Sequence, residues 1–178
     1  MKLGLNKDEV KLVPYTSEWN AEFMRVKQQI KDATNIGDNH IEHIGSTAII
    51  GMVAKPIIDI LVGVEDIALV DTSLMKDLKK IGFLRLKVER PGEIVFAKFT
   101  DDTYEVKTHY IHLVDFEKEL WNNLLFFRDY LNAIVNAREE YKKMKITYAE
   151  RENMEITEYT DLKGPFVKSI YEKRKSRS

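Results

Sequence analysis

The 178-residue chain has the length of one domain and can bury a sizeable hydrophobic core. Its 28 Lys and Arg residues balance 29 Asp and Glu residues, and the resulting net charge of −1 argues against general binding of nucleic acids. The absence of cysteine excludes disulfides, thiolate metal ligands and cysteine nucleophiles, and no apolar segment approaches the roughly 20 residues of a membrane helix.

This composition predicts a cytoplasmic protein with a single domain over 1–178 and no membrane partner. In the first part of the chain, apolar residues at intervals of three and four predict amphipathic helices, and runs of β-branched residues predict strands. In chain order, the predicted elements are a helix from Ser17 to about 35–38, a strand over 41–44, a short helix or turn over 48–52, a strand over 57–64 and a helix over 66–81.

The second part of the chain changes from strands to helices. The predicted strands span 83–88, 93–99 and 104–114. The pattern is helical from Phe116 almost to the end, with one break at 164–165. This order predicts an α+β fold in which helices cover one face of a mixed sheet, with a sheet-rich part over about 12–115 and a helical part over about 116–172.

A glycine-serine turn follows the first predicted strand and offers a place for a phosphate. Gly45 lets a ligand approach the backbone, the free amides of a helix start favour an anion, and Ser46 and Thr47 follow. Asp59, inside the next predicted strand, would hold a divalent cation, because a buried carboxylate is costly unless it is paired or bound to a metal. The alternatives are a turn that only caps a helix and a carboxylate that only accepts backbone hydrogen bonds.

Two histidines lie close together in the last predicted strand. In a regular strand, Glu105, Lys107 and His109 share one face. His112 points to the opposite face, so the two histidines do not form a simple metal clip. Each of them is either a ligand or a packed core residue.

Basic residues of the predicted helices have a functional and a structural interpretation. Arg128 either clamps a phosphate with its guanidinium group or ties its helix to the sheet through a carboxylate. A further set of basic and aromatic residues is typical of a solvated helix face. This set consists of Tyr141, Lys142, Lys143, Lys145, Tyr159 and Lys163.

Four separated motifs occur in a fixed order. The segments 43–48, 54–60, 108–113 and 127–131 read HIGSTA, AKPIIDI, THYIHL and FRDYL. In order and spacing they resemble the GrpB family, and the resemblance extends over about 12–172. It includes residues after the fourth motif, namely Tyr141, Lys145, Tyr159, Thr160 and Lys163. Agreement among several separated motifs is more specific than any one of them.

The GrpB family is similar to the nucleotidyltransferase superfamily with the polymerase-β-like fold. This resemblance implies a Gly-Ser turn and, on the next strand, acidic residues that bind Mg²⁺. The turn at 45–46 and the carboxylate of Asp59 match this pattern, while Leu61 replaces the second carboxylate. Glu105 or His109 would complete the metal site.

The resemblance implies Mg²⁺-dependent transfer of a nucleotidyl group from an NTP to an unknown acceptor. The implied catalytic residues are Asp59, Glu105 and His109, the implied metal ligands are Asp59 and Glu105, and the implied phosphate-binding residues are Gly45, Ser46, Thr47, Lys55, Lys107 and Arg128. The alternative is an inactive relative that binds a nucleotide or another phosphate-bearing small molecule without turnover. A third hypothesis is an interaction module built on the basic tail 173–178.

Overall fold

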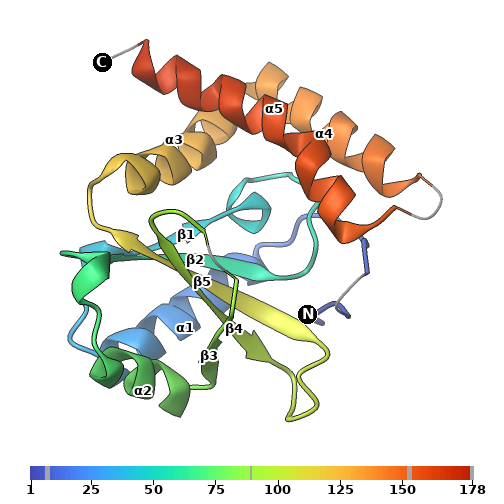
Figure 1. Ribbon diagram of the computed structural model, residues 1–178. Coiled ribbons are helices and arrows are strands. Elements are labelled where there is room, and N and C mark those ends of the chain that lie inside the picture. Colours follow the sequence, from blue (N-terminus) through green and yellow to red (C-terminus); the bar gives the residue numbers. More distant parts are fainter. Residues whose placement is uncertain (7–8, 89, 152–153, 177–178) are drawn as a thin grey trace.

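The computed structural model describes residues 1–6, 9–88, 90–151 and 154–176 (Figure 1). These residues form a five-stranded mixed sheet with the strand order β1-β2-β5-β4-β3. The strands are β1 (Ile41–Ile44), β2 (Ile58–Val64), β3 (Phe83–Arg85), β4 (Glu93–Phe99) and β5 (Lys107–Asp115). The neighbours β2 and β5 are parallel, and the other described pairs are antiparallel.

Helices lie on both sides of this sheet. Figure 1 shows α1 (Glu18–Ala33) and α2 (Thr72–Lys80) on one face, with α3 (Glu119–Ala133), α4 (Val135–Ala149) and α5 (Ile156–Lys175) across the other side. The predicted α+β fold with a mixed sheet and a helical C-terminal part is confirmed. Among the described residues, none of the helices combines the length and the apolar character that crossing a bilayer requires.

The main hydrophobic core lies between the sheet and α1. Side chains of α1 at intervals of three and four pack against alternate residues of β2 and β5, as the sequence pattern predicts. The buried residues include Trp19, Phe23, Val26, Ile30, Ile58, Ile60, Val62, Ile111 and Leu113. Each large apolar side chain that is buried in this way stabilises the fold by about 1.5–3 kcal/mol.

The opposite face of β2 is covered over only part of its length. Leu61 is fully buried there, in a cluster with Trp121 of α3. Asp59 points to the same face because side chains alternate along a strand, but its side chain is 30% exposed. The carboxylate therefore lies just outside the region that α3 covers.

The helix predicted over 66–81 is divided in the structure. It consists of a 3₁₀ turn (Ile67–Leu69) and the separate helix α2. The side chain of Asp66 caps the first segment and that of Asp71 caps the second, each by accepting hydrogen bonds from backbone N–H groups. Because each aspartate starts its own helical segment, one continuous helix does not form.

The break predicted at 164–165 does not occur, because Pro165 lies inside α5. Phe166 and Val167, which follow the proline, pack against a cluster formed with α3 and α4, and Ile170 is buried in it. This packing outweighs the hydrogen bond that proline cannot donate. Residues 177–178 of the basic tail lie outside the described residues.

The strand predicted over 104–114 begins only at Lys107. Tyr104 has a φ of 58°, in the left-handed region that a regular strand does not contain. Glu105 therefore lies in the loop before β5 and does not share a strand face with His109. The strand predicted over 83–88 is also shorter, since β3 ends at residue 85.

Candidate functional site

The turn after β1 brings its backbone onto Asp59 of the neighbouring strand. Ile44 pairs with Asp59 in the register of β1 and β2, and the chain then passes through Gly45 into a 3₁₀ turn (Ser46–Ala48). Gly45 has a φ of 70° and a ψ of −171°, a conformation that essentially only glycine adopts. A Cβ atom at this position would lie 2.4 Å from Oδ2 of Asp59. Glycine thus allows the turn and the carboxylate to lie in direct contact.

Gly45→Ala is expected to lower the free energy of unfolding by about 2–4 kcal/mol, because it combines backbone strain with a clash against Asp59. Gly51→Ala is the matched control, since Gly51 has a φ of 77° but nothing within 4 Å of its Cβ position. We expect this control to cost about 1–2 kcal/mol. Urea denaturation measures both variants, and equal losses would show that the contact with Asp59 constrains nothing.

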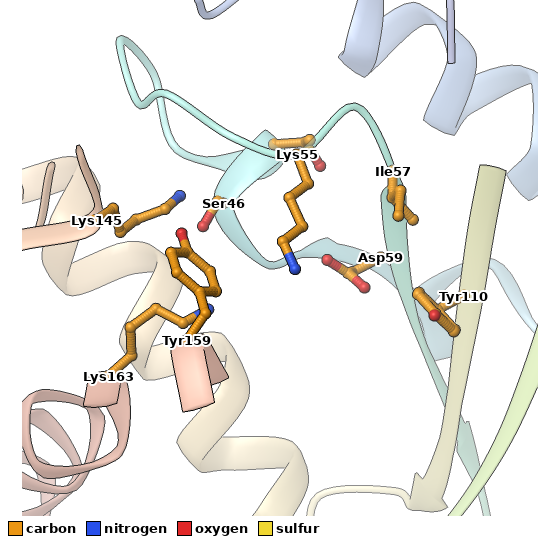
Figure 2. Close-up of a pocket in the computed structure, with 9 residues that line it drawn as sticks. Ser46, Lys55, Ile57, Asp59, Tyr110, Lys145, Tyr159 and Lys163 are labelled. Atoms are coloured by element: carbon orange, nitrogen blue, oxygen red, sulfur yellow. The ribbon is translucent and has the colours of Figure 1, made fainter. Parts of the chain in front are cut away.

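A cavity of about 160 Å³ lies beside this turn (Figure 2). Its walls come from the turn, from the segment that leads into β2 and the start of that strand, from β5, and from α4 and α5. The lining residues are Ser46, Thr47, Lys55, Ile57, Asp59, Tyr110, Lys145, Tyr159 and Lys163. Figure 2 shows the Tyr159 hydroxyl group pointing toward Ser46 and the Lys55 amino group pointing toward Asp59. Residues that are distant in the sequence therefore enclose one polar space.

Three lysines give this cavity an excess of positive charge. Lys145 is only 2% exposed and donates a hydrogen bond to the Val53 carbonyl group. The Nζ atoms of Lys55 and Lys163 lie 4.8 Å and 4.1 Å from the centre of the Tyr159 ring. Burial lowers the pKa of Lys55 and the pKa of Lys163 to about 8, and it lowers the pKa of Lys145 as well. The ion pairs of the described residues include none of these lysines, so their amino groups are available to an anion.

The hydroxyl group of Tyr159 is buried at the same cavity and has no hydrogen-bond partner among the described residues. The whole residue is 1% exposed. Burial raises the pKa of Tyr159, so the hydroxyl group keeps its proton and remains a donor. An unsatisfied buried donor costs about 1–3 kcal/mol. A ligand oxygen that accepts this hydrogen bond would offset the cost.

His112 of β5 lies between two carboxylates. Its Nε2 atom is 3.2 Å from Oδ1 of Asp59, and its Nδ1 atom contacts Oε1 of Glu93 at hydrogen-bond distance. An ionised carboxylate only accepts hydrogen bonds, so both ring nitrogens donate and the imidazole is protonated. Burial opposes this charge, but the two carboxylates outweigh burial and raise the pKa of His112 to about 9. Asp59 therefore already compensates a positive charge within the protein.

A second cavity of about 360 Å³ adjoins the first and shares Lys55, Ile57, Asp59 and Tyr110 with it. Its outer wall combines apolar and basic side chains with the acidic side chain of Glu9. These include Leu5, Leu86, Val88, Arg90, Val95 and Lys107. The two cavities together offer a charged pocket and, next to it, a larger and more apolar one.

The structure brings together the residues expected around the Gly-Ser turn, but it places Arg128 elsewhere. Nη1 of Arg128 donates to Glu42 Oε2 at 2.6 Å and to the His43 carbonyl oxygen at 2.9 Å. These bonds tie α3 to β1, which is the structural alternative that the sequence left open. Thr47 lines the cavity, but its hydroxyl group is engaged with Nε2 of His43 at 2.9 Å.

Glu105 and His109 do not lie beside Asp59. Glu105 is exposed in the loop before β5. Asp59 pairs with Tyr110 in the parallel register of β2 and β5, so His109 points to the opposite face, toward α1. There Nε2 of His109 lies 2.9 Å from Oε1 of Glu22, and burial lowers the pKa of His109 to about 4. His109 is thus a neutral core residue, and the alternation of the strand places His112 beside Asp59 in its stead.

The prediction that Lys145, Tyr159 and Lys163 lie on a solvated helix face is wrong. Lys145 and Tyr159 are almost fully buried, and all three residues line the cavity. A signal was present, because Tyr159 and Lys163 are one helical turn apart, as are Tyr141 and Lys145. In each pair the lysine lies over the tyrosine ring, at 4.1 Å and 5.4 Å from its centre. Such a repeated pairing indicates a lysine that turns inward rather than toward water.

The described residues do not fit the Mg²⁺ site that the resemblance implies. Mg²⁺ requires several oxygen ligands in near-octahedral geometry. In the part of the chain that the structure describes, no three metal-ligating side chains are grouped closely enough to hold an ion. Asp59 is engaged by His112, and Leu61, at the position of the second carboxylate, is buried against Trp121. A divalent cation therefore lacks a set of ligands here.

Comparisons with known proteins give a consistent set of relatives. A family model described as GrpB protein matches residues 9–173. The glutamate-rich protein GrpB of Alkalihalophilus pseudofirmus is 41% identical over 169 residues, which are 94% of this chain and 97% of that protein. A UPF0157 protein of Halalkalibacterium halodurans is 30% identical over 90% of this chain and 80% of its own.

Two solved structures show how similar the fold of this chain is to known folds. The crystal structure of the conserved protein GrpB from Enterococcus faecalis has a TM-score of 0.79 and 28% identity, and the match covers 94% of this chain and 100% of that chain. A structure of the Cid1 poly(U) polymerase with bound MgGTP has a TM-score of 0.46 and 14% identity, over 75% of this chain and 45% of that one. The second similarity is too distant to support a functional argument.

Proposed function

The chain belongs to the GrpB family, and we propose that it binds the phosphate groups of a nucleotide, or of a similar small molecule, in the cavity beside Asp59. The observation that carries this proposal is the buried Tyr159 hydroxyl group, which has no partner among the described residues. A phosphate oxygen that enters the cavity would accept its hydrogen bond once the side chains that enclose the hydroxyl oxygen move apart. The three lysines of the same cavity would offset the phosphate charge, and charge-assisted hydrogen bonds are about twice as strong as neutral ones.

The adjoining cavity supports a ligand that is larger than phosphate itself. It begins at Lys55 and Asp59, where the first cavity ends, and continues along Leu86 and Val88. An apolar wall suits a base or another flat organic group, because its burial is favourable without further hydrogen bonds. A nucleotide combines both parts in one molecule.

Transfer of a nucleotidyl group from an NTP, the reaction of the nucleotidyltransferase superfamily, has less support. The Gly45 turn beside Asp59 favours a place in that superfamily. The chemistry would also require Mg²⁺, and the ligands for this ion are incomplete. Binding without turnover is therefore the function that we favour.

Isothermal titration calorimetry with ATP and with tripolyphosphate tests the proposed function. We expect saturable binding of both compounds at neutral pH, with affinity falling about tenfold or more between about pH 7.5 and about pH 9.5. The reason is that Lys55 and Lys163 lose their protons above a pKa of about 8, while the triphosphate keeps its charge. No binding of either compound, or an affinity that does not change over this pH range, would contradict the proposal.

A further inference from the structure

We propose that this site binds phosphate groups directly, without a divalent cation, and that Asp59 is the charge partner of His112 rather than a metal ligand. This inference rests on the proposed function and specifies how the ligand charge is compensated. It differs from what the nucleotidyltransferase resemblance implies, where the same aspartate would hold Mg²⁺.

The two oxygens of Asp59 already have neighbours in the protein. Oδ1 lies 3.2 Å from Nε2 of His112, and Oδ2 lies directly against Gly45, where a Cβ atom would be only 2.4 Å away. His112 is in turn fixed by Glu93, whose side chain is 9% exposed. A metal ion that binds Oδ1 would have to displace the His112 contact.

The charges around the cavity also favour an anion without a metal. The carboxylates of Asp59 and Glu93 are balanced by the imidazolium of His112 and by Arg90, whose Nη1 atom lies 3.5 Å from Glu93 Oε2. The lysines 55, 145 and 163 add positive charge to the cavity, which the nearby Asp59 offsets only in part. The triphosphate of a nucleotide carries several negative charges and matches this excess. Coordination by Mg²⁺ would cancel part of the ligand charge and would bring a further cation close to the imidazolium.

The neighbouring positions cannot supply the missing metal ligands. Leu61 is the next residue of β2 on the same face and is fully buried in the cluster with Trp121. Tyr110, which pairs with Asp59 on β5, offers a phenol group rather than a carboxylate. Burial raises the pKa of Tyr110, so this group stays neutral. The site therefore has several cationic groups around one carboxylate that is already paired.

The test measures ATP binding to the full chain by calorimetry, once with EDTA and once with excess Mg²⁺. We expect equal or tighter binding with EDTA. Asp59→Asn is expected to bind ATP about threefold to tenfold more tightly in EDTA, because one negative charge leaves the site. Asp102→Asn is the matched control, since it makes the same change in an exposed turn and is expected to leave the affinity unaltered.

Binding that requires Mg²⁺, or that is lost in Asp59→Asn while the variant remains folded by circular dichroism, would overturn the inference. If Asp59→Asn does not fold, ATP binding to the unaltered protein with EDTA and with Mg²⁺ still tests whether the site requires a divalent cation. The two proposals fail in different ways. Absence of ATP binding under both conditions refutes the proposed function itself, whereas binding only with Mg²⁺ refutes the cation-independent site alone.

Discussion

Leu61→Asp is expected to unfold the protein or to lower its free energy of unfolding by about 4 kcal/mol or more. The substitution would create in this sequence the acid-apolar-acid pattern that active nucleotidyltransferases carry. In the structure, however, the new carboxylate would replace a fully buried leucine that packs with Trp121. It would lose the burial of an apolar side chain and add a charge without a partner. Urea denaturation measures the loss.

Leu61→Met is the matched control for this prediction. It keeps the volume and the apolar character of the side chain, so we expect a loss below about 1.5 kcal/mol. A Leu61→Asp variant that remains as stable as this control and binds Mn²⁺ would contradict the prediction. It would show that α3 can move aside and that the second metal ligand can be recovered.

Lys163→Met is expected to weaken the binding of ATP by about tenfold or more and, at the same time, to stabilise the unliganded protein by about 1–2 kcal/mol. The affinity falls because a charged donor leaves the cavity. The stability rises because burial holds the pKa of Lys163 near 8, so that keeping this lysine charged at neutral pH costs folding free energy. The contact of its Nζ atom with the Tyr159 ring offsets only part of that cost.

Lys168→Met is the matched control, because Lys168 is exposed on the same helix. It removes the same charge from the chain but none from the cavity, and we expect little change in affinity or stability. Calorimetry with ATP and urea denaturation are carried out on both variants. A Lys163→Met variant that is less stable and binds ATP normally would show that the lysine serves the fold instead of a ligand.

The sequence predicts the elements of this fold well wherever a pattern is local. Apolar residues recur at helical spacing in α1 because one face of this helix is buried. The β-branched residues of β2 form an almost continuous run because both faces of this strand are covered over most of its length. The Gly-Ser turn and Asp59 are also recognisable from the sequence. Glycine permits a close approach to the backbone, and a carboxylate in an apolar strand is costly unless it is paired or bound to a metal. The predicted boundaries of the elements are wrong where one side chain determines where a helix begins. Asp71 is an example, because it caps α2 and so divides a segment whose sequence pattern predicts one continuous helix.

The partners of Asp59 could not be predicted in the same way. The choice between His109 and His112 depends on the register of β2 against β5, and that register joins segments about fifty residues apart. The inward position of Lys145 and Lys163 depends on how α4 and α5 dock, and basic residues on helices usually face water. Composition and spacing describe one segment at a time, whereas this site is formed by several segments together.

The walls of the cavity come from early and late parts of the chain, and this has a consequence for biosynthesis. The Gly45 turn and β2 leave the ribosome long before Tyr159 and Lys163, which lie on α5. A nascent chain that has completed its sheet still lacks the unsatisfied hydroxyl group and two of the three lysines, Lys145 and Lys163. Binding of the proposed ligand would therefore require that α5 has been made and has docked, so that ligand binding would report the docking of this helix.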